Sequence, residues 1–181
     1  TAAHLPITHI SVYSLILEEG TPFWHQRERG HLRLPSEEES WAMYQDMCRI
    51  PAQYGFRRYE ISSFARPGYE SAHNQKYWRM DPYIGIGPSA HSNVGDLRWG
   101  NSPDLAAYMK TLSDGALPPH EKRVLTEKSR MEEYCFLHLR MTEGIGAEDF
   151  QNSFGHPLAY WYGNTISRLE SEKLIRRDSG R

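Results

Sequence analysis

The sequence lacks several features that would place it in a class at once. Only two of its 181 residues are cysteines, Cys48 and Cys135, and they lie far apart along the chain. This usage excludes a disulfide scaffold and a CxxC zinc site, and it favours a reducing, cytoplasmic setting. No apolar run approaches membrane-spanning length and no signal peptide opens the chain, so we expect no integral membrane segment.

The chain also lacks an excess of charge of either sign. It has 21 basic and 23 acidic side chains, a formal net charge of −2 with histidine neutral. Such a balance produces no long-range field that would attract phosphate backbones, and we expect no nucleic-acid partner. The length is sufficient for one full domain or two small ones with a real core.

The first half of the chain has the pattern of an α/β protein. Residues 10–17 form an almost unbroken apolar run, typical of a strand that is covered on both faces. A capping box, with Ser36 at the N-cap and Glu39 at N3, predicts that a helix follows. Residues 55–61 are a second predicted strand and residues 83–86 a third. Strand, helix and strand in this order predict a parallel sheet with a right-handed crossover.

The pattern changes after a proline-rich segment at residues 117–119, where we place a domain boundary. The predicted domains are 1–116 and 117–181. A helix with one apolar face is expected to begin after Ser102-Pro103 and to end at Gly115. Beyond the boundary, helical segments are predicted at residues 127–141, 147–154 and 158–173, with a possible strand at 174–175. Three helices followed by a β element indicate a small, mostly helical, winged-helix-like domain.

The most informative stretch is HNQKYW at residues 73–78, followed by YIGIGPSAHS at residues 83–92. A histidine beside two large aromatic side chains can seat a flat macrocycle and ligate a metal. His73 can equally be a loop histidine that bonds to backbone, with Tyr77 and Trp78 in a core, since nine histidines offer many ordinary roles. Glycines in the second segment suit either close backbone approach to a ligand or a tight strand-to-helix turn. It has neither GxxxxGK nor GxGxxG spacing.

These motifs resemble the HemW branch of the oxygen-independent coproporphyrinogen III oxidase family, within the radical SAM superfamily. The matching segments are ISVYSL at 10–15, EEGTPF at 18–23, GF at 55–56, YEISSFA at 59–65, PGYE at 67–70, HN at 73–74, YW at 77–78 and GIGPSAHS at 85–92. The resemblance is strong over about the first 112 residues and looser beyond them. It implies a partial (β/α) radical SAM-type barrel in residues 1–116, followed by the family's C-terminal domain.

The resemblance also implies cofactors and the residues that hold them. The expected heme site has His73 as the ligand to heme iron, with Asn74, Tyr77 and Trp78 against the porphyrin. The expected S-adenosylmethionine contacts are Ser14, Gly87, Ser89 and His91. The family's CxxxCxxC motif, which holds a 4Fe-4S cluster, is absent from these 181 residues. We therefore expect a portion of a longer radical SAM protein, with no catalytic residue and no cluster of its own.

Three functions remain open at this point. The first is a heme chaperone that binds heme and passes it to heme-accepting proteins. The second is oxygen-independent coproporphyrinogen III oxidation, a radical decarboxylation in porphyrin biosynthesis. The third is an interaction module without a ligand. Carboxylates at Glu18, Glu19 and Glu60 can bind an amine or take up a proton, although such groups are more often ordinary polar ends.

Overall fold

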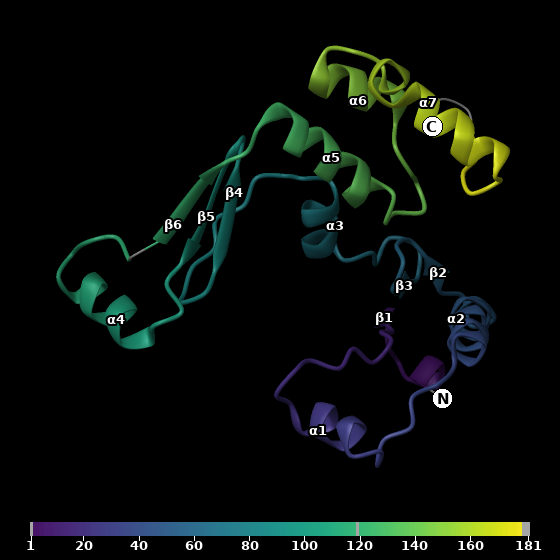
Figure 1. Ribbon diagram of the computed structural model, residues 1–181, viewed down its shortest axis with the longest axis horizontal. Helices are drawn as coiled ribbons and strands as arrows, with labels where there is room; N and C mark the ends of the chain where they lie inside the picture. The colour runs from purple at the N-terminus through teal and green to yellow at the C-terminus, as the bar shows by residue number, and fades with distance from the viewer. Residues whose placement is uncertain (1, 119, 179–181) are drawn as a thin grey trace. The chain divides into compact units, whose positions relative to one another are not determined.

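The computed structural model describes residues 2–118 and 120–178, and it divides after Ser71 into two compact units (Figure 1). The first unit is Thr1–Ser71 and the second is Ala72–Arg181. Among the described residues there are seven α-helices and two small three-stranded sheets, one in each unit. The predicted mixed α/β class is confirmed, and the partial barrel stays a prediction.

The sheet of the first unit is antiparallel. It contains β1 (His9–Ser11), β2 (Arg57–Arg58) and β3 (Ser63–Ala65), in the order β1-β3-β2. Both outer strands run antiparallel to β3, so the predicted parallel sheet is wrong: β3 lies between the two predicted strands. The chain turns back between β2 and β3, and the N–H of Tyr59 donates to the carbonyl of Ser63 at 3.2 Å.

The apolar run at residues 10–17 is strand only at its beginning. The N–H of Val12 donates to the carbonyl of Ser62 at 2.8 Å, and residues 12–17 have no strand assignment. Leu15 is 58% exposed and Ile16 is 80% exposed. The expectation of a strand covered on both faces is therefore wrong for this segment, because β3 is too short to pair with it.

The first unit also contains three helical segments, of which α2 packs on the core. They are η1 (Ala2–His4), α1 (Pro22–Glu28) and α2 (Glu37–Ala52). The predicted capping box is confirmed: the N–H of Glu39 donates to Ser36 Oγ at 3.1 Å, and the N–H of Ser36 donates to Glu39 Oε2 at 2.8 Å. Phe56 and Phe64 form the buried centre, against which side chains of α2 pack.

The sheet of the second unit is an antiparallel set that sequence reasoning did not find. It contains β4 (His91–Val94), β5 (Leu97–Asn101) and β6 (His120–Val124), in that order. The third predicted strand, residues 83–86, is reduced to a single bridge between Tyr83 and Asn93. Short polar strands carry little period-two signal, and their pairing is set by contacts distant in sequence.

The domain boundary at residue 117 stays a prediction. Strand β6, which follows it, pairs with β5, which precedes it, so this sheet takes strands from both predicted domains. Pro119, which belongs to the predicted boundary, and residues 179–181 of the predicted second domain lie outside the described residues.

The helices of the second unit are α3 (Ala72–Trp78), α4 (Leu105–Ser113), α5 (Glu127–His138), α6 (Ala147–Phe154) and α7 (Leu158–Ser171). The last three lie within the predicted segments, and residues 174–175 form no strand. Met131, Tyr134, Phe150 and Phe154 form the core between α5 and α6. The winged-helix arrangement stays a prediction. None of the described helices is both long and apolar enough to span a bilayer.

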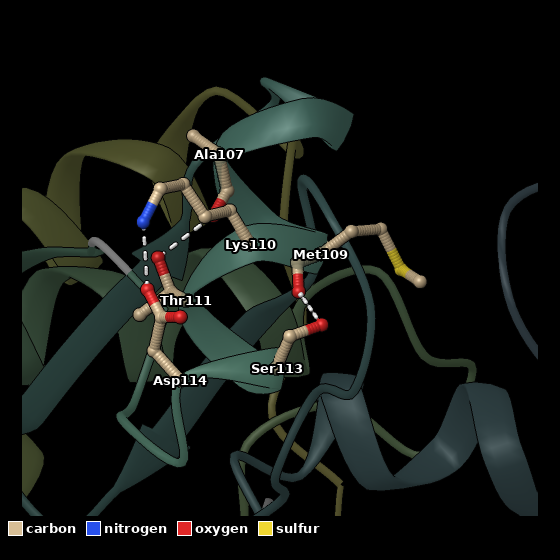
Figure 2. A network of polar contacts seen from close by, with 6 residues as sticks. All are labelled: Ala107, Met109, Lys110, Thr111, Ser113 and Asp114. Atoms are coloured by element: carbon tan, nitrogen blue, oxygen red, sulfur yellow. Dashed lines mark hydrogen bonds and ion pairs between the residues drawn. The ribbon is translucent and has the colours of Figure 1, made fainter.

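Helix α4 is held by polar contacts along its exposed side (Figure 2). Lys110 Nζ lies 2.8 Å from Asp114 Oδ2, and the hydroxyl of Thr111 donates to the carbonyl of Ala107 at 2.7 Å. Its predicted apolar face is only partly covered, because Tyr108 is buried whereas Met109 is 56% exposed. The helix forms as predicted, but a single buried side chain rather than an apolar face anchors it.

The substitution Phe150→Ala is expected to lower the free energy of unfolding by about 3–5 kcal/mol, because it empties a fully buried aromatic site. The measurement is urea denaturation followed by circular dichroism. Phe136→Ala is the matched control, since Phe136 is 61% exposed on α5 and its loss should change stability by about 0.5 kcal/mol. Equal effects of the two substitutions would contradict this placement of the core.

Candidate functional site

Helix α3 places the histidine of the HNQKYW segment beside a tyrosine. His73 and Tyr77 are four residues apart, so both rings lie on one side of the helix. Their centroids are 4.9 Å apart at an interplanar angle of 85°, and Tyr77 meets Tyr83 edge-on at 4.7 Å. We call these three rings the aromatic row. The imidazole of His73 is exposed and the two tyrosines are half-buried, so the row leads from the surface inward.

Trp78 turns to a different partner from Tyr77. The guanidinium carbon of Arg140 lies 4.3 Å from the centroid of the Trp78 ring, a cation–π contact. The indole Nε1 is buried and has no hydrogen-bond partner among the described residues. Because Arg140 follows α5, this contact fixes the end of α3 against the helical part of its unit.

Tyr83, at the inner end of the aromatic row, is held by hydrogen bonds to Asn93, which in turn accepts from Arg98. Tyr83 exchanges both backbone hydrogen bonds with Asn93, each at 2.9 Å. Arg98 donates from Nε to Asn93 Oδ1 at 3.0 Å and from a terminal nitrogen to Glu133 at 2.6 Å. Burial raises the pKa of Tyr83 above its ordinary value, and the nearby Arg98 charge opposes that rise. Tyr83 is therefore a neutral phenol at neutral pH.

The glycine-containing loop before β4 is bonded within the protein. The N–H of Gly87 donates to Tyr108 Oη at 3.1 Å, and its carbonyl accepts from Asn101 Nδ2 at 2.9 Å. The N–H of Ser89 donates to the carbonyl of Ser102 at 3.2 Å. Gly87 has φ of +114° and Ser89 has φ of +60°, so the loop needs a glycine at the first position. It leads into strand β4, so it is not the strand-to-helix turn that was one of the two interpretations of this segment.

A groove of about 850 Å³ runs beside this loop over the sheet of the second unit. Ser89 and His91 line it, together with residues 98–103 and 121–123. The imidazole of His91 leans over Gly100, where an added Cβ would lie 2.7 Å from the ring. This volume is in the range of small-molecule sites.

The structure brings together some of the predicted residues. His73 and Tyr77 lie in contact, Asn74 is half-buried on the same helix, and Trp78 packs elsewhere. Gly87 and Ser89 lie in the loop before β4, and Ser89 and His91 line the groove beside it. Ser14 is exposed and belongs to the first unit.

The other candidate groups are dispersed. Glu18 and Glu19 are exposed, whereas Glu60 is 2% exposed within the first unit. Cys48 and Cys135 are free thiols, and burial raises the pKa of Cys135 to about 11. Among the described residues, no three histidine, cysteine or acidic side chains are grouped closely enough to hold a metal ion.

Sequence reasoning missed Tyr83, Arg98, Glu133 and Arg140 as supports of the candidate site. Each acts through a partner distant in the sequence, and no local motif marks such a residue. Of these four residues, Tyr83 lies in a segment with a sequence prediction, because it begins the predicted strand at residues 83–86.

The chain is similar to proteins that are concerned with heme. The profile of the HemN C-terminal domain matches residues 125–181. The heme chaperone HemW of Lactococcus lactis is 39% identical over 181 residues, covering 98% of this chain and 46% of that protein. HemW of Bacillus subtilis is 34% identical over 97% of this chain and 46% of that protein. The chain thus spans about half the length of these relatives.

Two further similarities extend the comparison. The mitochondrial radical S-adenosyl methionine domain-containing protein 1 of Danio rerio is 37% identical over 76% of this chain and 33% of that protein. The solved structure of coproporphyrinogen III oxidase (HemN) from Escherichia coli, a radical SAM enzyme, matches with a TM-score of 0.70. That match covers 98% of this chain and 44% of HemN at 19% identity, so it shows a shared fold alone.

The substitution Gly100→Ala is expected to move the His91 imidazole out of its present position. An alanine Cβ would lie 2.7 Å from His91 Cε1 and 2.9 Å from Nδ1, and the flexible side chain would give way. The measurement is the His91 ring resonance in a carbon–proton correlation spectrum. Gly163→Ala is the control, because a Cβ there meets nothing within 4 Å. An unchanged His91 resonance in Gly100→Ala would refute the contact.

Proposed function

We propose a heme-binding and heme-transfer role for this chain, which belongs to the family of HemW heme chaperones and HemN coproporphyrinogen III oxidases. The proposal concerns the longer protein type to which the relatives belong, because the chain spans 46% of the length of the HemW proteins it matches. In that protein the chain supplies the imidazole that binds heme, and acceptor heme proteins receive the heme.

The observation that carries the proposal is the exposed His73 ring. An axial ligand must present an unshielded ring nitrogen to the iron, and His73 is the outermost ring of the aromatic row. Tyr77 holds the ring edge-on from one turn away, which limits its rotation. The residues therefore fit a heme bound from one side at the surface of α3.

The neighbours of His73 take different roles in this proposal. Tyr77 offers an aromatic edge at the porphyrin, and Asn74 lies on the same helix with a half-buried side chain. Trp78 has one ring face occupied by Arg140, so that face cannot stack on a porphyrin. We assign Trp78 mainly to fixing α3, and thereby the direction in which His73 points.

The second part of the proposal concerns S-adenosylmethionine. Ser89 and His91 line one end of the groove, and Gly87 lies in the loop that precedes it. Ser14, in the first unit, is proposed as a cofactor contact on its own. The backbone N–H groups of Gly87 and Ser89 are already bonded within the protein. Contacts to the cofactor therefore come from side chains of the groove. A 4Fe-4S cluster, when bound by the longer protein, supplies the electron for radical chemistry.

A second candidate function is coproporphyrinogen III oxidation. The match of residues 125–181 to the HemN C-terminal domain favours it, because HemN is that oxidase. The chaperone has the stronger support, since the relatives with the higher identity over nearly the whole chain are HemW proteins.

The substitution His73→Ala is expected to abolish a saturable Soret shift when hemin is titrated into the chain, because the iron loses its axial nitrogen. His156→Ala is the matched control: His156 is exposed, and it stacks on Tyr160, four residues later, with ring centroids 4.3 Å apart. The control should keep the Soret shift of the unchanged chain. Equal hemin affinity and spectra in all three proteins would remove His73 as the ligand.

A reaction assay separates the two candidate functions. The full-length protein is reconstituted with its cluster and supplied with coproporphyrinogen III, S-adenosylmethionine and a reductant. Mass spectrometry is expected to show no loss of carboxylate from the tetrapyrrole, whereas HemN serves as the positive control. A decarboxylated product would favour the oxidase and overturn the chaperone proposal.

A further inference from the structure

Tyr83 lies at the inner end of the aromatic row and has no proposed contact with heme. Its ring meets the Tyr77 ring with the centroids 4.7 Å apart at an angle of 72°, and Tyr77 in turn meets His73 at 4.9 Å. Among the described residues, the core between α5 and α6 and the side chains packed against it do not include Tyr83. The Tyr83 ring therefore supports the helix that carries His73 and does not fill the core of its unit.

The backbone fixes the direction in which the Tyr83 ring projects. Tyr83 and Asn93 exchange both backbone hydrogen bonds at 2.9 Å, and the N–H of Gly85 donates to Ser92 Oγ at 2.9 Å. Asn93 is 2% exposed and Ser92 is 1% exposed. Ile84 is 71% exposed, so its side chain and the Tyr83 ring project to opposite sides, as they do in a strand. Buried partners thus hold this segment, and the ring with it.

The partner of Tyr83 is itself held by an ion pair. Asn93 Oδ1 accepts from Arg98 Nε at 3.0 Å, and a terminal nitrogen of Arg98 lies 2.6 Å from a carboxylate oxygen of Glu133. Burial raises the pKa of Tyr83, and the charges of Arg98 and Glu133 act on it in opposite directions. The ring therefore packs against Tyr77 as a neutral phenol on a fixed support.

Helix α3 depends on such contacts because it is short. It has seven residues, and isolated helices of fewer than about 12–15 residues are marginal in water. The cation–π contact between Trp78 and Arg140 holds its last residue. His73 is its second residue, and the ring contact of His73 is with Tyr77. The orientation of the imidazole therefore depends on what holds Tyr77.

We propose that Tyr83 is a positioning residue for heme, because through Tyr77 it sets the orientation of the His73 imidazole that binds the iron. The inference rests on the proposed heme-binding role of His73. Outer partners that orient a metal ligand typically contribute about 10–100-fold to metal affinity. Edge-to-face contacts between aromatic rings have a preferred geometry, which an aliphatic side chain does not supply. A phenylalanine can therefore replace Tyr83, whereas an aliphatic residue cannot.

The test compares variants with and without an aromatic ring at this position in a hemin titration followed by Soret absorbance. Tyr83→Leu is expected to weaken hemin binding about tenfold, because the support of Tyr77 is lost. Tyr83→Phe should retain the affinity of the unchanged chain. Tyr83→Val is made alongside Tyr83→Leu, because a β-branched residue suits the extended backbone of this segment.

Electron paramagnetic resonance of the bound ferric heme separates positioning from stability. The spectrum arises only from molecules that hold heme, and it depends on the orientation of the axial imidazole relative to the porphyrin. In Tyr83→Leu the signals should shift or broaden, because the His73 ring samples more orientations. In Tyr83→Phe they should stay unchanged. A loss of stability alone lowers the amount of bound heme and leaves the spectrum of the bound heme as it was.

Tyr162→Leu is the matched control. Tyr162 is a half-buried tyrosine of the same unit, and it packs against the core between α5 and α6. Its replacement should keep both the hemin affinity and the resonance spectrum of the unchanged chain. Circular dichroism checks the fold of each variant. Loss of the fold in both Tyr83→Leu and Tyr83→Val would make Tyr83 a structural residue and overturn the assignment.

The possible results separate this inference from the proposed function. A Tyr83→Leu variant with unchanged affinity and spectrum would refute the positioning role, as would equal losses in Tyr83→Phe or in Tyr162→Leu. If His73→Ala still abolishes the Soret shift in that case, the proposed heme role stands without it. If the unchanged chain does not bind hemin, or if His73→Ala binds it equally well, the proposed function fails and this inference fails with it.

Discussion

The ion pair between Arg98 and Glu133 is the contact on which the second unit most depends. It joins β5 to α5 at 2.6 Å, with the two side chains 31% and 24% exposed, so solvent screens it only in part. The same guanidinium also holds Asn93, whose backbone is paired with Tyr83. Sheet, helix and aromatic row therefore meet at one side chain. A lysine at this position would lack the planar guanidinium that lets Arg98 bond Asn93 and Glu133 at the same time.

This dependence explains why the candidate site was only partly predictable. The four-residue spacing of His73 and Tyr77 is a local property, and it brings the two rings together once α3 forms. The helix itself was not expected. The covering of Trp78 by Arg140 and the support of Tyr83 by Arg98 arise from tertiary packing, so no spacing in the sequence encodes them.

The fold shows the same division between local and distant causes. Helices with clear local signals, such as α2 with its Ser36–Glu39 capping box, begin where the sequence predicts. Strands were predicted less accurately than helices, because apolar character alone does not reveal whether a partner strand is present. Residues 12–17 have the composition of a buried strand and remain outside the sheet, whereas the charged β6 lies inside one. Fold similarity to HemN likewise does not choose between functions, and the choice depends on individual side chains.

The exposed segment that follows β1 has a consequence for how the chain behaves in concentrated solution. β1 lies at one edge of its sheet, and the adjoining residues include Tyr13 and Ile16, which are 71% and 80% exposed. A strand edge continued by uncovered apolar side chains is a template onto which another extended chain can add. A lysine introduced near Ile16 would act as a gatekeeper against such addition.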